Sequence, residues 1–135
     1  MHSLEFPWMA DATLVQRLTH SEWRPNLLVL SRDLEPDAVV APLMASGRRP
    51  YHVCRLPGAL AFPEVRGGTL FLVNLAALTL GQQMRLYDWI DDDGREFQVV
   101  SIARESLYPL VEEGRFMEAL YYRLNVVCLD AGQPF

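Results

Sequence analysis

Five short apolar runs are spaced along the chain, and segments with helical character lie between them. The run from Leu70 to Leu75 follows two glycines, is interrupted only by Asn74, and lacks the alternation of a half-exposed strand. This pattern predicts a strand that is buried on both faces, which is typical of parallel sheets covered by helices. Similar runs predict strands at 27–30, 51–56, 97–103 and 125–129. The alternation predicts an α/β fold, a three-layer α/β/α sandwich around a five-stranded, mainly parallel sheet.

The segments between these runs predict the helices. We expect them at 11–20, 36–45, 80–90, 106–114 and 115–124. Pro42 should shorten or kink the second helix, because proline cannot donate its backbone hydrogen bond. Thr79 and Gln82 form a capping-box pair before the third helix, whose Met84, Tyr87 and Ile90 are expected to share one face. At 135 residues the chain is expected to form a single domain, 1–135.

Charge and hydropathy narrow the class of partner. The formal net charge is -5 and the sequence pI is about 5.1, which disfavours nucleic acid and anionic membrane surfaces as partners. No apolar run approaches the roughly 18 to 20 residues of a membrane span, and the first residues lack a signal-peptide pattern. We therefore expect a cytoplasmic protein, without a membrane partner, that binds proteins or small molecules.

Metal chemistry has little support in the sequence. Cys54 and Cys128 lack metal-ligand spacing and are expected to be free, buried thiols. The acidic run from Asp91 to Gly94 lacks the alternating ligands and the closing glutamate of a calcium loop, so it predicts a solvated turn. No metal site is predicted.

Nucleotide chemistry is also disfavoured. All twelve basic residues are arginines, whereas the usual phosphate-binding loop uses a lysine. The segment Ser31–Asp37, which follows the first predicted strand, contains three acidic residues and no glycine, so it is poorly suited to cradling a phosphate. Val73 and Asn74 lie at a strand tip, where α/β folds place their chemistry, but neither supplies a carboxylate or a general base.

Two segments carry a resemblance to a known family. These are Gly67 to Leu75 with its following helix, and the run Gly-Arg-Phe-Met-Glu-Ala-Leu-Tyr-Tyr-Arg-Leu-Asn-Val-Val from Gly114 to Val127. Both resemble the AAA+ module of sigma-54-dependent transcriptional activators, the bacterial enhancer-binding proteins. The resemblance is good over 67–129 and weaker, but in order, over 4–56. It implies a P-loop NTPase-like core with the first strand central and the second and fifth strands at opposite edges.

The resemblance also shows where this chain departs from the family pattern. The magnesium-binding Asp-Glu pair of the family falls on Val73 and Asn74. The phosphate loop falls on the segment that contains Ser31, Pro36 and Asp37, with Asp37 at the position of the lysine. The sensor asparagine falls near Arg104. These departures imply a domain that is not an enzyme and uses no cofactor.

Part of the family's subunit-contact surface is retained. Of two arginines that family members direct toward a neighbouring subunit's nucleotide, one position holds Met117 and the other keeps Arg123. Arg115, Tyr121 and Arg123 are therefore the candidate subunit-contact residues. The family's sigma-factor loop is reduced to 57–66 and its hairpin to about 91–96. The sequence ends where the resemblance places a helical lid, so we expect neither the lid nor direct DNA binding.

Three functions follow as hypotheses. The favoured one is a catalytically inactive AAA+-like domain that acts by protein contact in transcription regulation, with a related AAA+ activator or a second copy as its partner. The alternative is weak nucleotide or small-ligand binding without hydrolysis, with Arg32 or Arg104 replacing lysine. A receiver-like signalling domain is a third hypothesis, because Asp33 and Glu35 follow the first strand, but it lacks the matching lysine.

Overall fold

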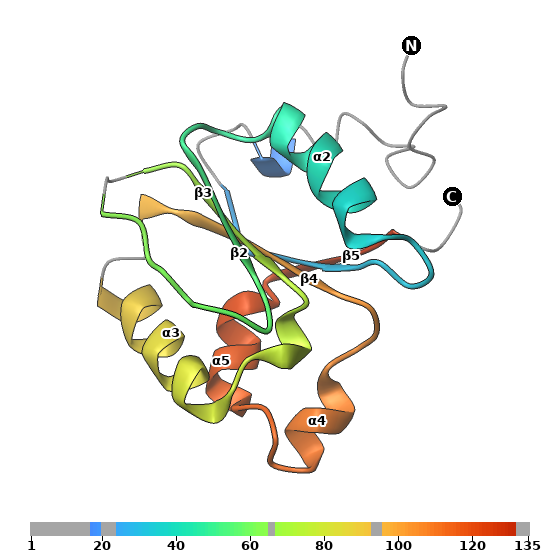
Figure 1. The fold of residues 1–135 in the computed structure, drawn as a ribbon, viewed down its shortest axis with the longest axis vertical. Coiled ribbons are helices and arrows are strands. Elements are labelled where there is room, and N and C mark those ends of the chain that lie inside the picture. Colours follow the sequence, from blue (N-terminus) through green and yellow to red (C-terminus); the bar gives the residue numbers. More distant parts are fainter. Residues whose placement is uncertain (1–16, 20–23, 65–66, 93–95, 132–135) are drawn as a thin grey trace.

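The computed structural model describes residues 17–19, 24–64, 67–92 and 96–131 (Figure 1). Within them, five parallel strands form one sheet in the order β2-β3-β4-β1-β5. The strands are β1 (Leu27–Leu30), β2 (Tyr51–Arg55), β3 (Thr69–Val73), β4 (Gln98–Ala103) and β5 (Val127–Asp130). The predicted α/β class and the parallel sheet are confirmed.

Helices cover both faces of this sheet. They are α2 (Pro36–Ser46), the short 3-10 helix η2 (Leu75–Ala77), α3 (Leu80–Asp92), α4 (Tyr108–Glu112) and α5 (Glu118–Leu124). Helix α2 lies on one face, and α3, α4 and α5 lie on the other (Figure 1). This arrangement is the expected three-layer sandwich, in which α2, α3 and α5 bury apolar residues against the sheet.

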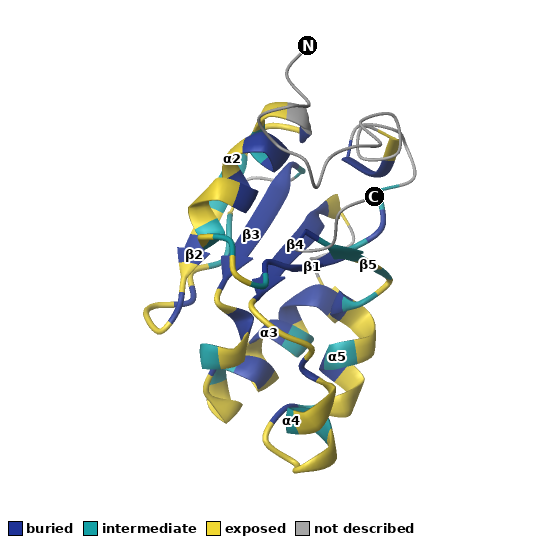
Figure 2. Cartoon of the chain, turned by 90° about the vertical axis from the view of Figure 1, so that its right-hand side faces the viewer, coloured by how far each residue is buried: buried dark blue, intermediate teal, exposed yellow. Residues whose placement is uncertain are grey.

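The core lies along β3 and β4, whose residues are buried throughout. Successive side chains of β3 point to opposite faces, as strand geometry requires. Leu70 and Leu72 join the core on the side of α3 and α5, whereas Phe71 and Val73 join the core on the side of α2. The buried strands therefore run between two apolar layers, while the outward sides of the helices are exposed (Figure 2).

The strand order confirms the predicted edges and corrects the predicted centre. Strands β2 and β5 are the two edge strands, but the middle strand is β4 and not β1. Cys54 in β2 and Cys128 in β5 are both free and lie at opposite edges, as expected. Cys128 is exposed, however, because a short edge strand leaves one side uncovered, so the prediction of a buried thiol was wrong for it.

Three helix predictions need correction. Pro42 lies inside α2, which nevertheless continues to Ser46, because the packing of Val39, Val40 and Leu43 against the sheet holds the helix. In α3 the buried residues are Gln83, Leu86, Trp89 and Ile90. The predicted face was therefore wrong at Met84, whose exposed fraction is 59%.

Helix α5 begins at Glu118, three residues later than the limit of the predicted helix at 115. Gly114 has a positive φ of 75°, and the backbone N–H groups of Arg115 and Phe116 both donate to the carbonyl of Leu110. A tight turn therefore occupies the segment that was expected to be helical. The predicted helix at 11–20 falls mostly outside the described residues. The turn predicted at 91–94 was wrong at Asp91 and Asp92, which are the last residues of α3, and its other two residues lie outside the described ranges. Across the described ranges, none of the helices is long and apolar enough to cross a bilayer.

Candidate functional site

A crevice of about 280 Å³ opens at the carboxyl ends of the parallel strands. It brings together six of the residues expected at a nucleotide site: Ser31, Pro36, Asp37, Val73, Asn74 and Arg104. Topology explains why they meet. The tips of β1, β3 and β4 lie on the same edge of the sheet, and α2 begins beside them. The sequence therefore located this crevice, although it could not establish what the crevice does.

The backbone after β1 is already hydrogen-bonded within the protein. The N–H of Ser31 donates to the carbonyl of Ala103 at 2.8 Å, and the N–H of Arg32 donates to the carbonyl of Arg104 at 3.0 Å. The N–H of Leu34 donates in turn to the carbonyl of Ser31 at 3.0 Å. A phosphate-binding loop needs such N–H groups to point at the ligand. Here these three donors stabilise the sheet and the turn instead.

Acidic groups stand where the helix begins. Glu35 precedes the first residue of α2 and Asp37 lies in its first turn, and both line the crevice. The N-terminal dipole of α2 favours an anion, but these two carboxylates already supply negative charge there. Asp37 pairs with Arg55 at the end of β2, with 2.5 Å between Oδ1 and Nη1. Asp37, where the resemblance implies a phosphate-binding lysine, is therefore an acid with its own partner.

The tip of β3 has no acidic side chain. Val73 is 5% exposed and packs into the core beneath α2. Asn74 adopts the left-handed conformation, with φ 69° and ψ 59°, which asparagine tolerates better than most residues. Its Nδ2 donates to the carbonyl of Leu56 at 3.1 Å. Asn74 thereby ties the end of β3 to the end of β2.

The two arginines proposed as replacements for lysine occupy different places. Arg32 donates from Nε and Nη2 to the carboxylate of Asp130, at 3.2 and 2.8 Å to Oδ2. This hydrogen bond is the main reason that the pKa of Arg32 is raised. Arg32 is thus bound to the end of β5, and only Arg104 lines the crevice.

The candidate contact surface lies on α5 and on the turn before it. The side chain of Arg115 is 72% exposed and faces Glu113, with 3.5 Å between the charged groups. Tyr121 is half-buried between the rings of Tyr108 and Tyr122, with centroids 6.2 and 5.3 Å away. Arg115 is therefore exposed and Tyr121 half-buried, and their assignment to a contact surface stays a prediction.

Arg123 is held by α3. Its Nη2 lies 2.9 Å from Oδ1 of Asp91, and its guanidinium lies 5.2 Å from the ring centroid of Tyr87. The hydrogen bond to Asp91 is the first cause of the raised pKa of Arg123. Arg123 therefore links two helices of its own domain.

Sequence reasoning missed two residues, one that lines the crevice and one buried beneath the turn before α5. Arg55 could have been found, because the last residue of a parallel edge strand reaches the same crevice. Gln83 is 1% exposed, accepts a hydrogen bond from the N–H of Met117 at 2.8 Å, and donates to the carbonyl of Arg115 at 3.1 Å. In the sequence, Gln83 stands three residues before Leu86 and so shares its helix face, which is the only sign that Gln83 faces the core. The contacts of such a residue cannot be inferred from the sequence.

Known protein families and proteins resemble this chain in sequence. The family model described as the sigma-54 interaction domain matches residues 51–133. The DNA-binding transcriptional regulator NtrC of Bradyrhizobium sp. (strain RP501 Parasponia) is 27% identical over 131 residues, which is 86% of this chain. The chain spans 27% of the length of that relative.

Solved structures share the fold. The structure of NtrX from Brucella abortus in complex with ATP has a TM-score of 0.71 at 17% identity, over 92% of this chain and 36% of that one. The P-loop NTPase domain of the sigma-54 transport activator from E. coli has a TM-score of 0.62 at 20% identity, over 91% of this chain and 95% of that one. At such identities the likeness concerns the fold, that of P-loop NTPase and AAA+ domains. Since the family model covers more than half of its length, the chain belongs to the sigma-54 interaction domain family and is related to sigma-54-dependent transcriptional regulators.

Proposed function

We propose that this domain is a catalytically inactive member of its family that acts by protein contact in transcription regulation. The observation that carries the proposal is the composition of the crevice. Asp37 stands in the first turn of α2 in an ion pair with Arg55, and Val73 and Asn74 form the tip of β3. Binding a nucleotide phosphate would need positive charge at the start of α2, where the crevice carries acidic side chains.

Phosphoryl transfer depends on positioning and on charge stabilisation. Metal ions, cationic side chains and backbone N–H groups offset the charge on the transferred phosphoryl group, and a further residue orients the attacking water. Val73 has no ligating atom, and the amide of Asn74 is engaged with Leu56. Glu35 and Asp37 would repel the phosphate oxygens. These features support loss of hydrolysis.

A role in protein contact is supported by the region around α5. Tyr108 and Tyr122 are exposed at 44% and 57%, and Leu80 and Met84 on α3 are exposed at 55% and 59%. Tyrosine, methionine and arginine are enriched at protein interfaces, where aromatic anchors carry much of the binding energy. We propose a related AAA+ activator, or a second copy of this chain, as the partner.

Association with an active relative tests this function. The purified chain is titrated into an NtrC-type activator while ATP turnover and particle mass are followed by a coupled assay and by light scattering. We expect a mixed complex and an altered turnover rate. The double variant Arg115→Glu with Tyr122→Ser should weaken both effects, and Arg85→Gln serves as the control because Arg85 binds the carbonyl of Leu60 on another part of the surface. Unchanged mass and turnover, with no self-association, would argue against a contact role.

One observation favours a second candidate function, weak binding of a small anion without hydrolysis. Arg104 is exposed and lines the crevice, and among the described residues it makes no ion pair. A carboxylate or phosphate held by Arg104 would stabilise the folded state by mass action. Thermal unfolding with and without the anion, repeated on Arg104→Gln, distinguishes this candidate from a purely structural crevice.

A further inference from the structure

Three tyrosine rings meet where α4 lies beside α5. The ring centroids of Tyr108 and Tyr121 lie 6.2 Å apart, and those of Tyr121 and Tyr122 lie 5.3 Å apart. Tyr108 and Tyr122 are exposed, and the outward sides of the two helices that carry them are exposed as well (Figure 2). These rings therefore form one aromatic surface that joins the two helices.

The middle ring of this surface is held in place. The hydroxyl of Tyr121 accepts a hydrogen bond from Nδ2 of Asn125 at 3.1 Å, and its ring packs against the core cluster on the side of α3 and α5. Tyr108 and Tyr122 meet this ring at interplanar angles of 57° and 72°. A side chain seated on the outer rings would therefore meet a surface of defined shape.

Two carboxylates border these rings. Glu112 stands four residues after Tyr108 on α4, and Glu118 stands four residues before Tyr122 on α5. Residues four apart are neighbours on a helix surface, so each acid lies beside an exposed tyrosine. Both acids are exposed, and within the part of the chain that the structure describes neither forms an ion pair. We call the three tyrosines and these two acids the tyrosine–glutamate face.

The arginines nearest to the tyrosine–glutamate face are engaged by other acids. The guanidinium of Arg115 lies 3.5 Å from the carboxylate of Glu113, and that of Arg123 lies 2.9 Å from Asp91. The face therefore carries a local negative charge, of the same sign as the net charge of -5 of the whole chain. A surface of this kind attracts cationic partners and repels nucleic acid and anionic lipid.

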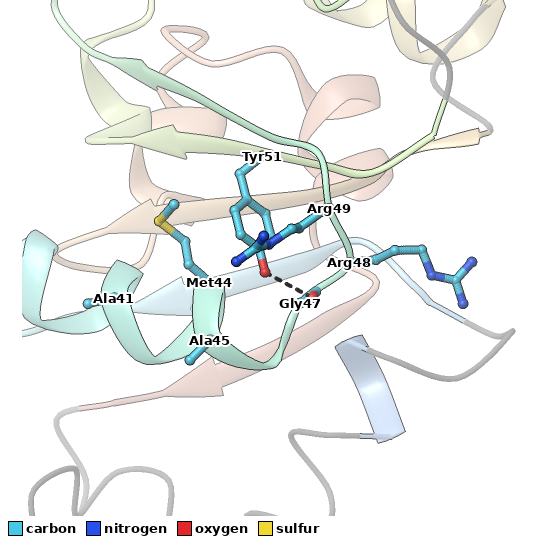
Figure 3. Close-up of a pocket in the computed structure, with 7 residues that line it drawn as sticks. All are labelled: Ala41, Met44, Ala45, Gly47, Arg48, Arg49 and Tyr51. Carbon is cyan, nitrogen blue, oxygen red and sulfur yellow. Dashed lines mark hydrogen bonds between the residues drawn. The ribbon is translucent and has the colours of Figure 1, made fainter.

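A second copy of this domain has little positive charge to offer to the face. At the hollow of about 560 Å³ where α2 ends and β2 begins, the guanidinium of Arg49 lies 5.9 Å from the ring centroid of Tyr51, and Arg48 extends away from the hollow (Figure 3). Arg32 and Arg55 form ion pairs with acids of their own domain. A different protein is therefore the better source of the complementary charge.

We propose that the tyrosine–glutamate face docks a basic segment of a partner protein, whose arginine side chains pair with Glu112 and Glu118 and lie over the rings of Tyr108 and Tyr122. Carboxylates attract any cation, and tyrosine rings add a cation–π contact that guanidinium groups make most often. This inference rests on the proposed contact role and adds the chemistry of the segment that the partner presents.

Fluorescence anisotropy tests the face. The probe is a labelled peptide of about twelve residues that alternates arginine and serine, and a matching peptide of glutamate and serine is the comparison. We expect only the arginine peptide to bind, and its affinity to fall as salt is raised, because exposed charges are screened. Glu112→Gln with Glu118→Gln should weaken this binding about threefold to tenfold. Tyr122→Leu, which keeps an apolar side chain but removes the ring, should weaken it about twofold to fivefold.

A matched variant separates the face from the charge of the whole domain. Asp33→Asn with Glu64→Gln removes the same number of charges from exposed positions, in the turn after β1 and in the connection from β2 to β3. This control should leave the affinity for the arginine peptide within about twofold of the unmodified domain. Unfolding curves of each variant show that the fold is kept. The inference is overturned if the arginine peptide fails to bind, if both double variants weaken it equally, or if the glutamate peptide binds as tightly.

Titration with the NtrC-type activator distinguishes this inference from the contact role on which it rests. We expect Glu112→Gln with Glu118→Gln to weaken the mixed complex as it weakens peptide binding. A mixed complex that forms equally well with this variant keeps the contact role and excludes the basic segment. Binding of the arginine peptide without any mixed complex supports the face and removes the activator as its partner. Self-association of the pure domain that Tyr122→Leu abolishes would assign the face to a second copy and overturn the inference.

Discussion

The carboxylate of Asp37 and the guanidinium of Arg55 form an ion pair that joins the first turn of α2 to the end of β2, with 2.5 Å between Oδ1 and Nη1. Both side chains line the crevice at the strand tips. The pair therefore neutralises an acidic side chain at the start of α2, within the crevice.

A double-mutant cycle measures what the pair contributes to stability. The side chains of Arg55 and Asp37 are 58% and 72% exposed, so solvent screens most of their attraction. For Asp37→Asn, Arg55→Gln and the double variant, we expect a coupling free energy below about 1 kcal/mol in urea unfolding. A coupling of several kcal/mol would mean that the pair holds the fold together and does not merely set the charge of the crevice.

Gln83 should matter far more to stability. Its amide bonds the N–H of Met117 and the carbonyl of Arg115, and Gln83→Leu would leave both backbone groups without that partner. We expect a loss of about 2–4 kcal/mol in the free energy of unfolding. Gln82→Ala is the matched control, since the Gln82 side chain accepts from the N–H of Thr79 at 3.1 Å and donates to the carbonyl of Gly58 at 2.8 Å, both at an exposed position. Gln82→Ala should lower the free energy of unfolding by only about 0.5–1 kcal/mol. Equal reductions for Gln83→Leu and Gln82→Ala would contradict this account.

These two cases show what the sequence could and could not predict. The strands follow from apolar runs, and β3 is buried on both faces as its lack of alternation indicates. The start of α3 follows from the Thr79 and Gln82 pair, whose reciprocal hydrogen bonds are present. At β3 and at the start of α3, the local sequence was therefore sufficient to predict the structure.

Contacts between distant segments could not be predicted in this way. The buried side of α3 includes Gln83, because its amide satisfies backbone groups of a turn about 30 residues away. Met84 looked like a core residue but is exposed. The ion pair between Arg55 and Asp37 also depends on how β2 and α2 are placed, which no local pattern specifies.

Arg123 provides a test of the link between α3 and α5. Arg123→Gln removes the ion pair with Asp91 and the contact with the ring of Tyr87. Because Arg123 and Asp91 are about half exposed, we expect the free energy of unfolding to fall by about 0.5–1.5 kcal/mol. Asp91→Asn, which keeps the ring contact, should cost less. A larger loss of unfolding free energy for Asp91→Asn than for Arg123→Gln would contradict the expectation that the ion pair and the ring contact both contribute to stability.

Cys128 provides a test based on pH. Cys128 is exposed as a residue, but the partial burial of its thiol, followed by the nearby charge of Asp130, raises the pKa of Cys128 above the usual 9.0. The folded domain therefore keeps this proton to higher pH than the unfolded chain, so the midpoint of its alkylation by iodoacetamide should lie above pH 9.0. The same shift should lower stability as the pH rises through this range. Cys128→Ser should abolish the fast labelling, because Cys54 is buried, and a midpoint below 9.0 would refute the assignment.

Titration with magnesium and ATP tests the proposed loss of nucleotide chemistry most directly. Were the crevice to bind ATP with a Kd of about 10 μM, 1 mM ligand would stabilise the fold by about 2.7 kcal/mol and raise the Tm by roughly 10 °C. We predict no saturable heat in calorimetry, an unchanged Tm and no phosphate release at millimolar ATP. A saturable Tm increase that is abolished in Arg104→Gln, or phosphate release by the pure domain, would contradict the account.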